Sequence, residues 1–173
     1  LPPTPDIEAA VKRDIERLQG MQNADGGFPI WKRGDDSWPY HTIHVAHALQ
    51  RAKLKGYTVP ADMLDQARAY LVAIETHYPA WYGKDVRNTL SAYALYVRSL
   101  AGDKDAAKAR KLLSDVGLEK LSPEAIGWLL SVLTDDPGST EQVTAIRRHL
   151  LNRVTETAGA AHFAASYSDQ DYV

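Results

Sequence analysis

Apolar residues recur at helical spacing along most of the chain and predict about seven α-helices. In the first predicted helix, the apolar positions share one face and charged residues cover the other; the apolar set is Ile7, Ala10, Val11, Ile15 and Leu18. Asp6 stands just before this pattern, where a carboxylate can cap the helix. We therefore expect an outer helix with one solvated side.

The second predicted helix has a different character. It begins near Ser37 and Pro39 and continues to about Lys55. Between Tyr40 and Leu49 it contains no Asp, Glu, Lys or Arg, and apolar residues occur on every side. This pattern predicts a helix that is buried all round.

Half-polar and apolar helices then continue to alternate. We expect Asp103 to cap the fifth helix and Ser122 to cap the sixth. Residues 158–173 are expected to form an irregular tail, with a short extended piece or ordered loop at His162–Tyr167. The remaining predicted helices cover about 60–75, 90–100, 104–114, 122–133 and 141–154.

The alternation predicts how the helices pack. An apolar helix must be covered on two sides, and two concentric layers of helices satisfy that need. Trp31 and Trp81 fall at matching places in successive helix pairs, which indicates an internal repeat of about 50 residues. We predict an all-α fold, an arc of α/α helical hairpins that is part of an α/α toroid. Residues 1–173 would form a single domain or an excised part of one, with the hairpins at about 6–157.

Composition excludes several classes of function. The net charge of −2 offers no basic excess for nucleic acid. The 173 residues include no cysteine, which excludes disulfides, thiolate nucleophiles and Cys-ligated zinc within this stretch. No run of about 20 apolar residues is present, so we expect no membrane contact. The chain begins at Leu1 without a signal-peptide pattern, and we expect a domain excised from a longer protein.

The turn between the first two helices is the most distinctive stretch of the sequence. Its Asp25-Gly26-Gly27 core favours a sharp corner, because glycine adopts positive φ without steric cost. We expect the Gln22 amide to reach backbone groups at the helix end. Phe28 and Trp31 would fold back as apolar anchors over the helix ends. The corner is interpreted as architectural.

Two constellations allow a ligand instead. In the corner, Asp25, Asp35 or Asp36 would act as an acid or a metal ligand. On the second helix, three histidines recur at i, i+3 and i+6 and two of them could share a metal; they are His41, His44 and His47. Core histidines and plain turns are commoner, so we expect no metal and no cofactor.

The segment from Leu18 to Phe28, with Ser37-Trp38 and the following helix, resembles the thioester-containing domain of the α2-macroglobulin and complement family. It is most similar to bacterial α2-macroglobulin-like proteins, in which a Gln-x-x-Asp-Gly-Gly-Phe turn precedes a Ser-x-Trp helix start. The resemblance implies a structural part of a large periplasmic or extracellular protease trap. Its partners would be target endopeptidases, bound through the full-length protein, and other domains of the same chain.

The resemblance also has limits. The family's thioester requires a Cys-x-Glu-Gln motif, which a chain without cysteine cannot supply. Relatives tune thioester reactivity with a His or Asn after the next aromatic turn, and Asn88 is the candidate here; a polar residue at a helix start is the plainer interpretation.

Other toroid families remain as alternatives. The Gln22, Gly26 and Phe28 pattern is also similar to the repeats of triterpene cyclases, and protein prenyltransferases share the architecture. An α/α toroid enzyme acting on an isoprenoid or polysaccharide is therefore one alternative, and a protein-binding scaffold is another. We expect no catalytic residue in this chain, because its apolar helices are nearly free of carboxylates.

Overall fold

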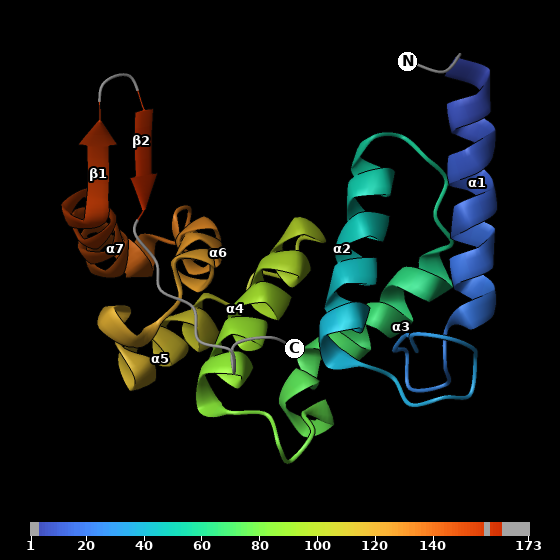
Figure 1. Cartoon of the computed structure of the whole chain (residues 1–173), viewed down its shortest axis with the longest axis horizontal. Helices are drawn as coiled ribbons and strands as arrows, with labels where there is room; N and C mark the ends of the chain where they lie inside the picture. The colour runs from blue at the N-terminus through green and yellow to red at the C-terminus, as the bar shows by residue number, and fades with distance from the viewer. Residues whose placement is uncertain (1–3, 158–159, 164–173) are drawn as a thin grey trace. The chain divides into compact units, whose positions relative to one another are not determined.

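The computed structural model describes residues 4–157 and 160–163, and most of these residues lie in helices (Figure 1). Within these residues, seven α-helices are accompanied by three short 3-10 helices, and a small antiparallel hairpin of two strands follows α7. The all-α class is confirmed. The elements are α1 (Thr4–Met21), α2 (Pro39–Leu54), α3 (Ala61–Val72), η1 (Ile74–His77), α4 (Lys84–Leu100), α5 (Ala106–Val116), η2 (Leu118–Lys120), α6 (Pro123–Leu133), η3 (Pro137–Ser139), α7 (Thr140–Arg153), β1 (Val154–Thr157) and β2 (Ala160–Phe163).

The chain divides into two compact units, Leu1–Tyr78 and Pro79–Val173. In the first unit, α2 packs against α3. The core of this unit is built mostly from the loop after α1 and from these two helices. Its largest fully buried side chains are Phe28, Ile43, Leu49, Met63, Tyr70 and Ile74.

In the second unit, α4 and α6 make the most extensive contact, and α5 and α7 both pack on α6. The rings of Tyr93 and Trp128 stack with their centroids 4.3 Å apart, which joins α4 to α6. Alanines 92 and 125 are fully buried in the same cluster, and such small side chains let helices approach closely. The other fully buried members include Leu129, Val132, Leu133 and Ile146.

The expected alternation of half-polar and apolar helices is confirmed for most elements. Two of the helices predicted to be half-polar bury few side chains; α5 buries Ala109 and Leu113, and α7 buries Val143 and Ile146. Along α4, by contrast, nearly every residue from Leu90 to Arg98 is buried. The arc expected for successive hairpins stays a prediction.

The prediction that the second helix is buried all round is wrong on one face. Tyr40 and His44 are exposed, and His41 and His47 are half-buried. The absence of formal charge does not require burial, because histidine and tyrosine are amphipathic and tolerate solvent as well as a core. Thr42, Ile43 and Ala46 on the opposite face are buried as expected.

The predicted helix starts are correct in part. Ser122 caps α6 by accepting a hydrogen bond from the Ala125 N–H at 3.2 Å. The cap of α5 is Asp105 rather than Asp103, since Asp105 accepts from the Lys108 N–H at 3.0 Å. Helix α1 begins at Thr4, so Asp6 lies inside its first turn instead of capping it.

The end of the helical region also differs from the prediction. The last helix that the structure describes ends at Arg153 rather than near residue 157, and Val154 pairs with Phe163 in an antiparallel hairpin. Residues 160–163 of the expected irregular tail are therefore a strand. The rest of the piece expected at His162–Tyr167, from residue 164 onward, lies outside the described residues. No described helix has the length and apolarity needed to span a bilayer.

Candidate functional site

Side-chain hydrogen bonds join the corner between α1 and α2 to the rest of the first unit, and Gln22 makes two of them. The Gln22 side-chain amide donates to the carbonyl oxygens of Gly26 and Met63, at 3.0 Å each. Gln22 is buried, so both carbonyls would lack these donors in any other arrangement of the side chain. The expected role of Gln22 in binding backbone groups is confirmed, and it extends to α3.

The two glycines of the corner are required for different reasons. Gly26 has φ of +84°, and a Cβ built there would lie 2.2 Å from the carbonyl oxygen of Gln66 in α3. Gly27 has an ordinary φ, yet its Cβ would lie 2.5 Å from the Ser37 Cβ and 2.7 Å from the Tyr70 ring. The corner therefore closes on α3 only because neither residue has a side chain.

Asp25 holds the corner together from within. Its Oδ1 accepts from the Gly27 N–H at 2.9 Å and from the Ser37 hydroxyl at 2.9 Å. Both bonds are accepted by the same oxygen, and the bond from the Gly27 N–H is that of an Asx turn. The alternative interpretation of Asp25, Asp35 or Asp36 as a metal ligand finds no support, since the residues described contain no group of three or more His, Cys, Asp or Glu that could hold a metal ion.

Phe28 and Trp31 behave differently. Phe28 is 1% exposed and is an anchor, as predicted; its N–H donates to the Thr42 hydroxyl at 2.9 Å. The prediction that Trp31 also folds back is wrong, because its side chain is 84% exposed. Phe28 is therefore the buried aromatic anchor of the corner, and Trp31 faces solvent.

Sequence reasoning missed Asn23, which orders the loop after the corner. Its side-chain NH₂ donates to the Asp35 carbonyl at 2.8 Å and to the Ser37 hydroxyl at 2.9 Å. Its side-chain oxygen accepts from the Gly34 N–H at 2.9 Å. The available signal was an Asn beside the Asp-Gly-Gly core, since Asn side chains readily bind nearby backbone in turns.

The aromatic turn at residues 78–83, which precedes α4, is bound by an arginine side chain. Arg87 on α4 donates to the carbonyl oxygens of Tyr82 at 2.9 Å, Pro79 at 3.0 Å and Ala80 at 3.2 Å. An arginine fork thus replaces the glutamine amide as the group that binds the turn. Asn88, the candidate thioester-tuning residue, lies half-buried early in α4, and its role stays a prediction.

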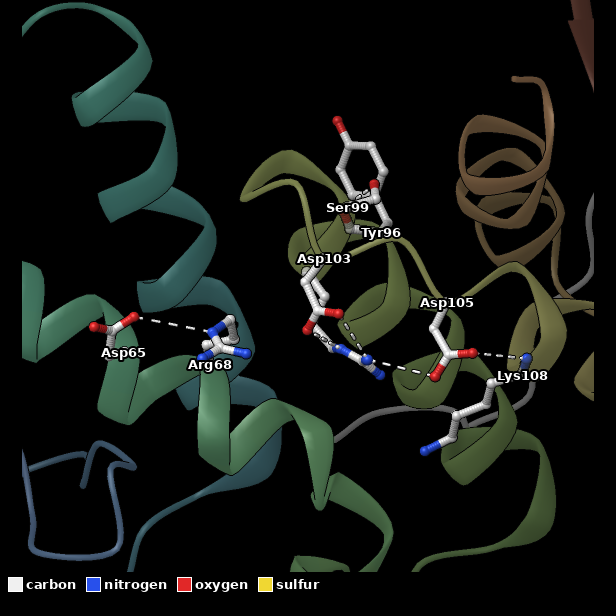
Figure 2. A network of polar contacts seen from close by, with 8 residues as sticks. Asp65, Arg68, Tyr96, Ser99, Asp103, Asp105 and Lys108 are labelled. Carbon is white, nitrogen blue, oxygen red and sulfur yellow. Dashed lines mark hydrogen bonds and ion pairs between the residues drawn. The ribbon is translucent and has the colours of Figure 1, made fainter. Parts of the chain in front are cut away.

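An ionic cluster of buried Arg98 with two half-buried carboxylates joins α4 to α5. Arg98 is 6% exposed; it donates to Asp103 at 2.9 and 3.2 Å and to Asp105 at 3.4 Å. Figure 2 shows both carboxylates converging on one guanidinium group. Burial by itself would lower the pKa of Arg98, but hydrogen bonding and attraction to the two carboxylates outweigh it and raise the pKa. This cluster explains why Asp103 is unavailable as a helix cap.

We define His41, His44 and His47 as the histidine face of α2. These side chains could be metal ligands, but a metal site needs further ligands beside them. Burial, and then repulsion by His44, lower the pKa of His41. Burial, followed by repulsion from His44 and Arg51, lowers the pKa of His47. The Tyr40 ring stacks on His44 with centroids 5.9 Å apart. In the chain as described, no carboxylate completes a ligand set with these residues.

Comparisons with known proteins agree on one family. No protein-family model matches the chain. The chain is 36% identical to the α2-macroglobulin of Escherichia coli K12 over 64 residues, which are 37% of this chain and 4% of that protein. It is 27% identical to the α2-macroglobulin homolog of Yersinia pestis over 99 residues, 57% of this chain and 5% of the relative. The chain thus matches only a small fraction of the length of these curated relatives.

Solved structures extend the likeness over most of the chain. Native E. coli α2-macroglobulin matches with a TM-score of 0.72 and 23% identity, over 84% of this chain and 9% of that one. Salmonella α2-macroglobulin reacted with methylamine matches with a TM-score of 0.72 and 21% identity, over 84% of this chain and 10% of that one. At such identities the structural matches establish the fold. Together with the sequence matches, they confirm the resemblance to bacterial α2-macroglobulins.

Proposed function

We propose that this chain is a structural part of a bacterial α2-macroglobulin-like endopeptidase inhibitor and that none of its residues is catalytic. The observation that carries the proposal is the shared fold, which covers 84% of this chain and only 9% of native E. coli α2-macroglobulin. A protein of that kind acts as a whole, and one part of it supplies shape rather than chemistry. The target endopeptidases would be partners of the full-length protein, which would be periplasmic or extracellular.

The related structures support proteases as the partners. One is described as trypsin-activated E. coli α2-macroglobulin, and another as the same protein activated by porcine elastase. Trypsin and elastase cleave after different side chains, so a shared response to both fits a broad-spectrum inhibitor. We propose the same breadth for the protein that contains this chain.

The contacts of the corner support a structural role. Gln22, Asn23 and Asp25 direct their polar groups to backbone and side chains of the same unit. The glycines allow no substituent between the corner and α3. A site that binds a substrate would instead direct convergent polar groups into a cavity.

Any thioester would be supplied by a part of the parent protein other than this chain, because this chain has no cysteine. We propose that Asn88, if the parent has that thioester, lies near it and tunes its reactivity. Exchanging Asn88 for His would then change the relative rates at which the parent reacts with amines and with alcohols. Equal changes for both nucleophiles would contradict this role.

The inhibitor function is tested with the long natural protein that contains this chain. The protein is mixed with trypsin or elastase, and residual cleavage is measured on a large protein substrate and on a small chromogenic peptide. A trap hides the protease from large substrates only, so we expect cleavage of the protein substrate to fall and cleavage of the peptide to persist. Unchanged cleavage of both substrates with both proteases would refute the proposal.

A further inference from the structure

The loop Pro29–Asp36 presents a large apolar side chain to solvent. Trp31 is 84% exposed and its neighbour Ile30 is 42% exposed. Tryptophan has one of the largest apolar surfaces of any side chain, so its exposure to water costs free energy. The corner is anchored by Phe28 and not by this ring. The exposed pair Ile30 and Trp31 therefore requires another explanation.

The loop that carries this pair is ordered at both ends. At its start, Phe28 is buried, and the Phe28 carbonyl accepts from the Trp38 N–H at 3.1 Å. Near its end, Asn23 bonds the Gly34 N–H at 2.9 Å and the Asp35 carbonyl at 2.8 Å. These bonds hold a short segment in one conformation, with its indole directed outward.

An ordered, exposed tryptophan has the physical character of an interface anchor. Tryptophan is enriched among the residues that dominate binding energy, where it fills a pocket on the partner. Preorganisation reduces the entropy that binding would otherwise cost. The loop thus has both the contact area and the rigidity that docking requires.

Charge indicates what kind of pocket would fit. Lys32 and Arg33 follow Trp31, and Asp35 and Asp36 come two residues later, so the loop carries equal numbers of both signs. A contact 3.9 Å long also pairs Lys32 with Asp35. The loop therefore presents no net charge, and apolar contact would dominate its binding.

We propose that Trp31 and Ile30 dock into an apolar pocket on another domain of the same long polypeptide, outside residues 1–173. The argument for this occupant is length: the same fold is only 9% and 10% of the chains of the matched E. coli and Salmonella structures. A neighbouring domain on the same chain is present at high effective concentration, which favours it over a separate molecule. This inference rests on the proposed function, since it requires the long parent protein.

Oxidative footprinting of the intact long protein, with mass spectrometry of the peptide that contains residue 31, tests the docking. Trp31 should be labelled at least about 30-fold more slowly than in a free peptide of the same sequence. This ratio corresponds to a docking free energy of ~2 kcal/mol, the size expected for an interface anchor. In the 173-residue chain alone, the same residue should be labelled nearly as fast as in the peptide. Protection should persist in high salt, because apolar contact carries it.

Variants of the long protein supply the control. Trp31→Ala should accelerate amide hydrogen exchange in the pocket and in the loop, whereas Leu151→Ala, at a leucine that is 75% exposed, should leave both unchanged. Rapid labelling of Trp31 in the intact protein would overturn the inference. So would protection that depends on protein concentration, or that appears only after a protease is added, since a second copy or the protease would then be the occupant. A parent that traps proteases while Trp31 is labelled rapidly would refute the docking and leave the proposed function standing.

Discussion

The side-chain amide of Gln22 donates a hydrogen bond at 3.0 Å to the carbonyl oxygen of Met63, 41 residues further along the chain. The same NH₂ group donates to Gly26 at the same distance. One side chain thus joins the end of α1, the Asp-Gly-Gly turn and the first turn of α3. The corner is for this reason a tertiary element of the first unit rather than a local turn.

Replacing Gln22 by alanine should destabilise the Leu1–Tyr78 unit by about 2–3 kcal/mol, because two buried carbonyls lose their donor. Urea unfolding followed by circular dichroism measures the change. Gln19→Ala is the matched control, since Gln19 is exposed one turn earlier on α1, and it should shift stability by less than about 0.5 kcal/mol. Equal losses for both variants would show that the Gln22 bonds do not stabilise the corner.

Alanine at Gly26 and at Gly34 should separate steric exclusion from backbone strain. Both glycines have positive φ, +84° and +94°, but only at Gly26 would the new Cβ meet another atom, the Gln66 carbonyl oxygen. Gly34→Ala should cost only the left-handed strain, about 1–2 kcal/mol. Gly26→Ala should cost at least about 3 kcal/mol, because overpacking adds to that strain. Similar free energies of unfolding for the two variants would contradict the close approach of the corner to α3.

Arg98→Met should destabilise the second unit by about 2–4 kcal/mol, because it leaves the carboxylates of Asp103 and Asp105 facing each other without their cation. Lys111→Met provides the control, since Lys111 pairs with Asp115 on the exposed surface of α5. Such an exposed pair contributes about 0.3–0.5 kcal/mol. Thermal and urea unfolding measure the stability of both variants. A loss of stability in Arg98→Met no greater than that in Lys111→Met would show that the cluster does not stabilise the second unit.

Stability should fall as the pH decreases through the range in which histidine titrates. Burial lowers the pKa of His41 and His47 in the folded chain, so below about pH 6.5 the unfolded chain binds more protons than the folded one. The stability conferred by neutral histidines is complete above that pH and is lost progressively below it. Urea unfolding at pH 7.5 and pH 5.5 should show the loss.

The double variant His41→Gln/His47→Gln should reduce this pH dependence, because it removes both titrating groups. The carboxylate whose pKa is lowered, Asp135 beside Lys104, titrates at a far lower pH and should not contribute in this window. An unchanged slope between pH 7.5 and pH 5.5 in the double variant would assign the dependence to other groups.

The sequence was sufficient for the helices and for part of the corner. Apolar periodicity predicted seven helices because most of them bury an apolar face, and glycine in an Asp-Gly-Gly core predicted a sharp turn. Gln22 and Phe28 were identified for the right physical reasons. The precise partner of Gln22 was not predictable, since Met63 is brought to it only by the packing of α3.

The errors share a physical origin. Apolarity alone predicted that Trp31 folds back over the helix ends as Phe28 does, but which of the two aromatic rings is buried depends on tertiary packing, which no local pattern reveals. The position of Asp103 just before a helical pattern predicted a helix cap, but its carboxylate accepts hydrogen bonds from the buried Arg98 instead. Both outcomes depend on residues that meet in space, where periodicity gives no information.

The central claim is that this chain is one structural part of a much larger exported protein. An immunoblot of fractionated source cells, with an antibody raised against residues 1–173, tests it most directly. We predict a band far above the 19.1 kDa of this chain, in the periplasmic, envelope or secreted fraction. A band near 19.1 kDa, or one confined to the cytosol, would contradict the account and show that only the fold is shared with the α2-macroglobulins.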